Sequence, residues 1–297
     1  MHQAHPATSC LGRTFVRLLA VAIVVAMLAG MLTLAAAVTR AAVSTNWAGY
    51  VSKGHGASAR FGRVVGSWAQ PTASCAHAVT YSAFWVGLGG YSGGTTKLEQ
   101  TGTEADCTKT GRPLYGAWYE ILPNPPMHAR LAVRPGDVIA ASVTIDQTGV
   151  VLHLRNLTTG REFRKQIHTH NPDASTAEWI AEAPSECGRG SCHTLPLTNF
   201  GTVSFAGAAT ELGGYVAGIS SARWTALEIE LEGDFVGFTA STGPTFASAA
   251  PSRLTSSASA FSVTWKEVSA PAPSSTEQIG PPAPQGSPIA NASHVRF

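Results

Sequence analysis

Two segments of the chain combine strand-like alternation with carboxyl groups that are suited to acid–base chemistry. In TAEWIAEAP (residues 176–184), alternation places Glu178, Ile180 and Glu182 on one face. In LYGAWYEIL (residues 114–122), Trp118 and Glu120 share a face. Only 13% of the residues are charged, and a carboxylate buried without partners is costly. We therefore expect these groups to be paired, solvated in a cleft or functional, although each alone is more typical of a solvent-facing position.

A glutamine raises a related question in TTKLEQTGTEADC (residues 95–107), which alternates like a strand followed by a turn. Gln100 lies where an apolar residue is expected. Its amide NH2 donates hydrogen bonds at any pH, whereas a carboxyl group donates only when it is protonated. Gln100 is therefore either a donor for a developing oxyanion or a buried amide that satisfies backbone groups.

Two other motifs are weaker. GYSGG (residues 90–94) matches the G-x-S-x-G nucleophile elbow, but that elbow needs a helix after the serine, and the sequence that follows is not helical. His168 and His170 in HTH have no carboxylate or third histidine at a useful local spacing, so we expect solvent-facing loop residues. No metal or cofactor site is expected.

The elements that must position these residues are short strands. Alternating segments with β-branched and aromatic residues recur between turns such as RPGD and NLTTG, which is typical of an antiparallel sandwich or barrel. No helical periodicity lasts over three turns after the N-terminal segment. The predicted strands cover residues 62–70, 79–89, 114–122, 138–145, 149–157, 161–167, 177–183, 201–208, 224–233 and 260–265.

The two ends of the chain differ from this β-rich region. In residues 1–43, Arg13 and Arg17 precede a long apolar run that is followed by small residues, and this segment is interpreted as a secretory signal peptide; the alternative is an uncleaved membrane segment. Residues 44–268 form the predicted domain, and residues 269–297 form a Pro/Ser/Ala-rich tail expected to be disordered. Without the three arginines of the N-terminal segment, 17 basic residues face 18 acidic ones, so the composition indicates no nucleic-acid or anionic-membrane partner.

Export also affects the interpretation of the cysteines. Outside the N-terminal segment there are four, which allow three pairings in an oxidising compartment. Cys187 and Cys192 bracket the short glycine-rich loop GRGS, which a disulfide can close. This pairing leaves Cys75 to join Cys107.

A series of motifs resembles the glutamic peptidases, also called eqolisins, from about Asn46 to Trp265. The motifs are STNWAGYV, AFWVGLGG, LEQTG, YGAWYEILP, RPGDVIAASVT, LRNLTTG and AEWIAEAP, in that order. The resemblance implies an all-β sandwich of two antiparallel sheets, of the concanavalin-like or jelly-roll type. It also implies that Gln100 and Glu182 are the catalytic pair, with Glu182 rather than Glu178 as the second member.

The same resemblance suggests supporting roles around that pair. It implies that Glu104 and Glu120 lie near the cleft and hold Glu182 and water. Trp47 and Trp85 are either cleft aromatics or ordinary core residues. Gly89 departs from the family pattern, in which an acidic residue often occupies this position, so the hydrogen-bond network near it is expected to differ.

These features predict a secreted, acid-active endopeptidase that acts on polypeptides and is a monomer. Glu182 would deprotonate water and then protonate the leaving amine, while Gln100 would stabilise the oxyanion. The alternative is a carbohydrate-binding or glycoside-hydrolysing sandwich, which would use exposed tryptophans or the Glu120 and Glu182 carboxyl groups. The alternative gives no reason for Gln100 within Q-T-G.

Overall fold

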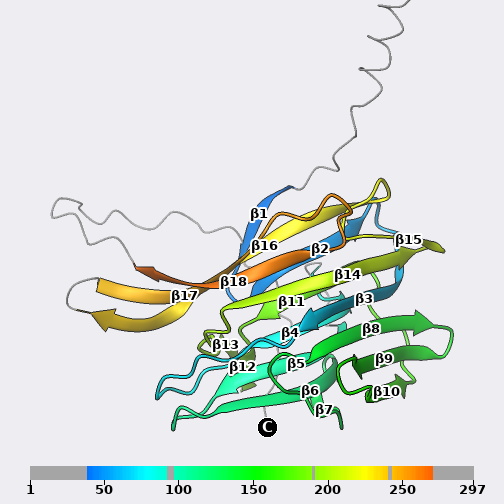
Figure 1. The fold of residues 1–297 in the computed structure, drawn as a ribbon. Coiled ribbons are helices and arrows are strands. Elements are labelled where there is room, and N and C mark those ends of the chain that lie inside the picture. Colours follow the sequence, from blue (N-terminus) through cyan, green and yellow to red (C-terminus); the bar gives the residue numbers. More distant parts are fainter. Residues whose placement is uncertain (1–38, 92–96, 189–190, 240–242, 270–297) are drawn as a thin grey trace, which may run out of the picture. The chain divides into compact units, whose positions relative to one another are not determined.

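The computed structural model describes residues 39–91, 97–188, 191–239 and 243–269, which lie in one compact unit, 37–297. All regular secondary structure in these ranges is β-strand (Figure 1). They contain no helix long and apolar enough to cross a membrane. The predicted signal segment up to residue 38 and the predicted tail from residue 270 lie outside the described residues.

Eighteen strands are present in the described ranges. In chain order they are β1 (Thr39–Ser44), β2 (Trp47–Gly54), β3 (Phe61–Ala69), β4 (Ala83–Gly89), β5 (Leu98–Cys107), β6 (Pro113–Ile121), β7 (Met127–His128), β8 (Val138–Asp146), β9 (Gly149–Asn156), β10 (Glu162–Ile167), β11 (Thr176–Glu182), β12 (Ser185–Gly188), β13 (Ser191–Thr194), β14 (Thr202–Leu212), β15 (Tyr215–Ala217), β16 (Trp224–Thr239), β17 (Gly243–Pro251) and β18 (Phe261–Ser269). Each of the ten predicted strands overlaps one of them.

Sixteen of the strands form two layers that are hydrogen-bonded into one continuous sheet, and β12 and β13 form a separate two-stranded sheet. The first layer has the order β10-β9-β8-β3-β14-β18-β17, and the second has the order β16-β2-β11-β4-β5-β6-β7. Pairing between β16 and β17 joins the two layers. The predicted all-β sandwich is confirmed, and its two layers belong to one 16-stranded sheet that is folded on itself. Strand β1 pairs with β16 in parallel.

The core lies between the two layers because side chains alternate along each strand. Trp68 and Phe205 from the first layer pack in the same cluster as Phe84 and Trp179 from the second. In β11 the residues on either side of Trp179 therefore point away from the first layer. This outward orientation is the one that alternation predicts for Glu178 and Glu182.

The described strands reach slightly beyond residues 44–268 at both ends. Strand β1 already begins at Thr39, and residues 39–44 pair with β16. At the other end, β18 extends to Ser269, one residue beyond the predicted limit of the domain.

Both predicted disulfides are present, and their loop lengths predict unequal contributions to stability. Cys75–Cys107 spans 32 residues and Cys187–Cys192 spans 5. Because a cross-link lowers the entropy of the unfolded chain more when its loop is longer, the Cys75→Ser/Cys107→Ser variant should lose about 4 kcal/mol of unfolding free energy. The Cys187→Ser/Cys192→Ser variant should lose about 2 kcal/mol. Denaturant unfolding without reductant measures both, and an equal or reversed order would contradict the entropic explanation.

Candidate active site

The predicted site residues lie on the face of the second layer that points away from the first layer, here called the site face. Glu182 of β11 pairs with Ala83 of β4, which in turn pairs with Glu104 of β5. Directly paired residues in an antiparallel sheet lie on the same face. These three residues therefore form one row across the site face.

Another row of paired residues lies four residues further along the strands. Glu178 of β11 pairs with Gly87 of β4, Gly87 with Gln100 of β5, and Gln100 with Glu120 of β6. Gln100 and Glu182 are thus on the same face, two strands and four residues apart, with Cα atoms about 16 Å apart from strand spacing and rise. Two long side chains at this separation can approach one group bound between them.

The Glu182 carboxyl group is held by nitrogen donors from β4 and from the bend between β1 and β2. Trp85 Nε1 donates to its Oε2 at 2.7 Å, and Asn46 Nδ2 donates to its Oε1 at 3.3 Å. Burial raises the pKa of Glu182 well above its usual value, and the charge of Glu120 raises it further. The hydrogen bond from Trp85, followed by Trp47 and Asn46, opposes this increase by favouring the carboxylate.

Gln100 is held by a different partner. Its Nε2 donates to Glu120 Oε2 at 2.5 Å, which fixes the orientation of the amide. Its Oε1 has no hydrogen-bond partner among the residues that the structure describes, although Gln100 is fully buried. The amide therefore keeps one acceptor and the second hydrogen of its NH2 group for a bound molecule.

Trp85 lies between the two predicted catalytic residues. It occupies the row between those of Glu182 and Gln100, and its ring contacts Trp47 edge to face, with ring centroids 5.1 Å apart. At Gly102, its partner on β5, an added Cβ would lie 2.6 Å from Trp85 Cβ and 2.1 Å from Phe84 O. Gly102 therefore permits Trp85 to pack against the sheet. Trp85 contacts Glu182 through its Nε1. The rings of Trp85 and Trp47 are also buried together in an apolar cluster.

The neighbourhood of Gly89 explains how this chain departs from the family pattern. An added Cβ on Gly89 would lie 2.5 Å from Asp173 Cβ and 2.7 Å from its Cγ. The Asp173 carboxyl group accepts a hydrogen bond from Gly90 N at 3.2 Å. A carboxyl group is thus present beside position 89, but it comes from the loop before β11. Gly116 similarly leaves room for Glu104, whose Oε1 would lie 2.5 Å from an added Cβ.

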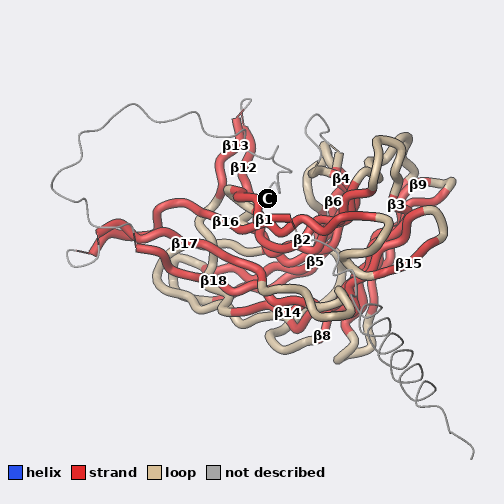
Figure 2. Tube along the Cα trace, turned by 90° about the horizontal axis from the view of Figure 1, so that it is seen from above, coloured by secondary structure: helices blue, strands red, loops and turns tan. Residues whose placement is uncertain are grey.

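The predicted pair is closed to solvent. Gln100 is 0% exposed, and Glu120 and Glu182 are each 1% exposed. A substrate carbonyl can therefore reach the pair only when its surroundings open. Figure 2 shows the hairpin of β12 and β13 projecting from the second layer on the side away from β14 and β8. This hairpin begins at Ser185, three residues after Glu182, and is closed by Cys187–Cys192.

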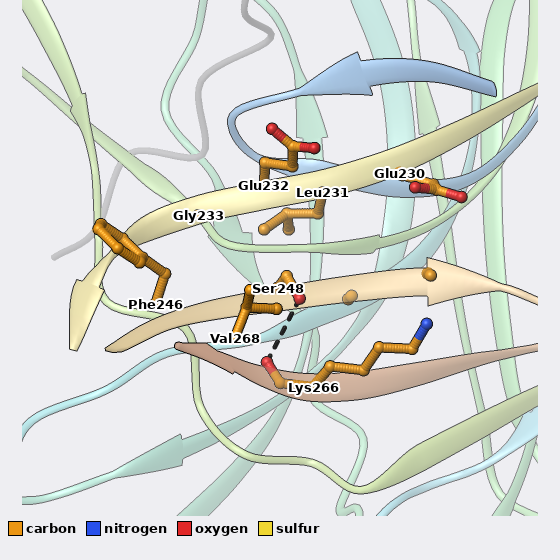
Figure 3. A pocket seen from close by; sticks show the side chains of 10 residues that line it. Glu230, Leu231, Glu232, Gly233, Phe246, Ser248, Lys266 and Val268 are labelled. Carbon is orange, nitrogen blue, oxygen red and sulfur yellow. Dashed lines mark hydrogen bonds between the residues drawn. The ribbon is translucent and has the colours of Figure 1, made fainter. Parts of the chain in front are cut away.

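Two hollows lie elsewhere on the domain. One, of about 550 Å³, is enclosed by β16, β17 and β18 (Figure 3). Glu230 and Glu232 line it on β16 and Lys266 on β18, where Ser248 Oγ donates to Lys266 O at 3.4 Å. The other, of about 330 Å³, lies on β3, β8 and β9. Neither hollow contains Gln100 or Glu182.

The weaker sequence motifs have no site in the described part of the chain. His168 and His170 are exposed and follow β10, as predicted for loop residues. Residues 92–96, which include most of GYSGG and the two residues after it, lie outside the described residues. The next described element is strand β5, which begins at Leu98, and not a helix. Within the described ranges, no group of three His, Cys, Asp or Glu side chains is arranged to hold a metal ion.

Asn46 is a site residue to which the sequence analysis gave no role. Ser44 Oγ donates to Asn46 Oδ1 at 3.1 Å, which orients the Asn46 amide toward Glu182. The Asn46 backbone carbonyl also accepts from Ala183 N at 2.8 Å. In the sequence, Asn46 was marked only by its place directly before Trp47 in STNWAGYV. Its hydrogen-bond partner, Glu182, is 136 positions away, so no local pattern links the two residues.

Comparison with known proteins identifies the family of the chain. The profile of the peptidase A4 family matches residues 45–247, which is more than half of the chain and includes all the predicted site residues. The chain therefore belongs to the peptidase A4 family, whose members are the eqolisins, or glutamic endopeptidases. A search among curated proteins finds no match.

Solved structures show the same fold. Scytalido-glutamic peptidase with a transition state analog inhibitor is 24% identical, with a TM-score of 0.58, over 75% of this chain and 98% of that one. SCP-B, a member of the Eqolisin family in complex with the tripeptide Ala-Ile-His, is 22% identical, with a TM-score of 0.51 and the same coverage. At this identity the likeness supports the β-sandwich fold.

Proposed function

We propose that the protein is an acid-active endopeptidase in which Glu182 activates water and Gln100 stabilises the oxyanion. The observation that carries the proposal is that both side chains lie on the site face, each with its own polar partner: Trp85 for Glu182 and Glu120 for Gln100. Such second contacts hold a catalytic group in one orientation.

The reaction follows from the two groups. The ionised Glu182 takes a proton from water, and the resulting hydroxide attacks the carbonyl carbon of the peptide bond. The oxyanion that forms accepts a hydrogen bond from the second N–H of the Gln100 amide. The protonated Glu182 then gives its proton to the leaving nitrogen, the C–N bond breaks, and Glu182 is again a carboxylate.

The ionisation of Glu182 links activity to opening of the site. Because burial raises its pKa, the closed site favours the protonated carboxyl group. When water and substrate enter, the effect of burial decreases, while the N–H groups of Trp85 and Asn46 remain to stabilise the carboxylate. Burial also raises the pKa values of two further acids, Glu99 and Glu178. The folded state therefore holds their protons more tightly than the unfolded state, which makes it more stable at acidic pH.

The carbohydrate alternative receives less support. A sugar-binding sandwich presents aromatic rings to solvent, whereas Trp47, Trp85 and Trp118 are at most 2% exposed. A glycosidase would use Glu120 and Glu182 as its carboxyl pair, but one Glu120 oxygen already accepts a hydrogen bond from the Gln100 amide. An amide in that place serves an oxyanion better than a glycosidic oxygen.

We also propose that the protein acts outside the cell and takes polypeptides as substrates. The apolar N-terminal sequence and the two disulfides support export, since disulfides persist in oxidising compartments.

Digestion of a denatured protein substrate from about pH 2 to pH 7 tests the proposed function. Cleavage should be greatest on the acidic side and should continue in the presence of pepstatin, because no pair of aspartates performs the chemistry. Inhibition by pepstatin would indicate an aspartic peptidase instead. Binding of sugars without any proteolysis would support the carbohydrate alternative.

A further inference from the structure

The bend that joins β1 to β2 is fastened to the end of β11 that carries Glu182. Ser44 ends β1, which pairs with β16, and Trp47 begins β2 and pairs with Glu182. Between them, the backbone carbonyl of Asn46 accepts from Ala183 N at 2.8 Å. Ser44 is 5% exposed and Asn46 is 2% exposed. Both side chains of this bend are therefore enclosed beside the proposed general base.

The Ser44 hydroxyl group uses its full hydrogen-bonding capacity within the bend. Its Oγ accepts from Asn46 N at 3.3 Å and from Trp47 N at 3.1 Å, which occupies both lone pairs. The hydroxyl hydrogen remains, and it is donated to Asn46 Oδ1 at 3.1 Å. Because Oδ1 accepts this bond, the Asn46 amide presents its NH2 group to Glu182, where Nδ2 donates to Oε1 at 3.3 Å. Two backbone N–H groups thus set the direction of the whole chain of hydrogen bonds.

The two side-chain nitrogens that contact Glu182 can only donate. They are Trp85 Nε1 on Oε2 and Asn46 Nδ2 on Oε1. A proton on Glu182 therefore finds no acceptor in either contact and remains available for the leaving nitrogen. An Asn46 amide with the opposite orientation would place Oδ1 against Glu182. That oxygen would repel the carboxylate and would accept the proton of the neutral carboxyl group.

We propose that Ser44 is a positioning residue for catalysis: it keeps the Asn46 amide oriented as a donor to Glu182, so that the Glu182 proton is passed to the substrate and not to Asn46. Ser44 acts through Asn46 and does not itself contact Glu182 in this chain of hydrogen bonds. The role rests on the proposed function, because it belongs to the same reaction. It also makes the end of β1 a part of the active site.

The charged groups around the Glu182 carboxyl group stay the same when Ser44 or Asn46 is replaced. Strands β2 and β4 place Trp47 and Ala83 beside Glu182, and neither side chain titrates. Among the described residues, the titratable groups around the site are the site-face acids Glu104, Asp106, Glu120 and Glu178, Glu230 of β16 beside β1, and the exposed hairpin residues Glu186 and His193. A change in the titration of Glu182 in these variants therefore reports the Asn46 donor.

Loss of this donor should change the ionisation of Glu182 in one direction. Burial raises the pKa of Glu182, and the hydrogen bond from Asn46 is one of the contacts that oppose this increase. When the Asn46 amide is removed or turned over, the pKa of Glu182 should rise further. The acidic side of the pH profile of kcat/KM reports the ionisation of the general base, so it should move to higher pH.

Profiles of kcat/KM against pH for the full chain and its variants test the role of Ser44. Ser44→Ala should lower kcat by about 10-fold, with little change in KM, and should move the acidic side of the profile to higher pH. Ser44→Thr keeps a hydroxyl group and should restore most of the wild-type profile. Thr45→Ala is the matched control, because it removes an exposed hydroxyl group from the same bend and should follow the wild type.

The Asn46→Asp variant decides the result if Ser44→Ala does not fold. It keeps the shape of the side chain, and one carboxyl oxygen can still accept from Ser44 Oγ. The other oxygen takes the place of Nδ2 and cannot donate when it is ionised. Two adjacent carboxyl groups disfavour a second negative charge, so the acidic side of this profile should move to higher pH than in the wild type.

Titration of the glutamate carboxyl carbons by NMR measures the same effect without proteolysis. The signal of Glu182 is the one that Glu182→Gln lacks, and its pKa should be higher in Ser44→Ala than in the wild type and unchanged in Thr45→Ala. A Ser44→Ala variant that loses kcat without either change would overturn the proposal, because Ser44 would then only support the fold.

Failure of this proposal and failure of the proposed function have different outcomes. An active wild type whose Ser44→Ala variant keeps the kcat, the pH profile and the Glu182 pKa would refute the role of Ser44 and leave the proposed function intact. An inactive wild type would refute the proposed function and, with it, the catalytic role of Ser44. A higher pKa of Glu182 in Ser44→Ala would then still support the orientation of the Asn46 amide.

Discussion

The Glu182→Gln variant is expected to lose at least about 10³-fold in kcat/KM for a peptide substrate. Glutamine has the same shape and can still accept the hydrogen bond from Trp85 Nε1. It can neither take a proton from water nor pass one to the leaving nitrogen. Because one group performs both steps, the loss should appear mainly in kcat, with little change in KM.

Glu186→Gln is the appropriate control for this measurement. Glu186 lies on β12, four residues beyond Glu182, and it is exposed beside His193. Its replacement changes the net charge by the same amount near the same strand and should leave kcat/KM within a few-fold of the wild type. Retention of most activity by Glu182→Gln in a folded protein would contradict the proposed role of the carboxylate.

Alternation along single strands was sufficient to predict much of the site face. The orientation of Glu178 and Glu182 depends only on the period of two in β11, which every extended strand shares. The same reasoning placed Glu120 beside Trp118. It could not predict that Gln100 contacts Glu120, because that contact depends on the register between β5 and β6.

The carboxyl group beside Gly89 shows where reasoning from sequence stops. A missing acidic side chain at position 89 was visible, but the Asp173 group that lies beside it is 84 positions away. These residues meet because the loop before β11 packs on the end of β4. No local pattern reports such a contact, and the same is true of Asn46 and Glu182.

Strand β17 was not predicted for a different reason. Its sequence GPTFASAAP is rich in alanine and proline, which have low strand propensity. It forms because β16 and β18 pair with it from both sides. Pairing partners thus overrode local propensity, and this strand is also the one that connects the two layers.

Gln100→Ala is expected to lower kcat/KM by about 10² to 10³-fold, which is typical for removal of one oxyanion donor. The loss should be similar at every pH at which the wild type is active, because the amide N–H does not titrate. Assays of the wild type and the variant across the active pH range measure this ratio. A small loss would mean that Gln100 only satisfies Glu120, its hydrogen-bond partner within the sheet.

The Gln100→Glu variant separates these two roles. A carboxyl group at position 100 donates a hydrogen bond only when protonated, and the adjacent Glu120 disfavours a second negative charge. At low pH this variant should therefore keep more activity than Gln100→Ala. As the pH rises through the pKa of the new carboxyl group, its activity relative to the wild type should fall, since a carboxylate repels the oxyanion. A constant ratio across the pH range would show that position 100 does not contact the reacting oxygen.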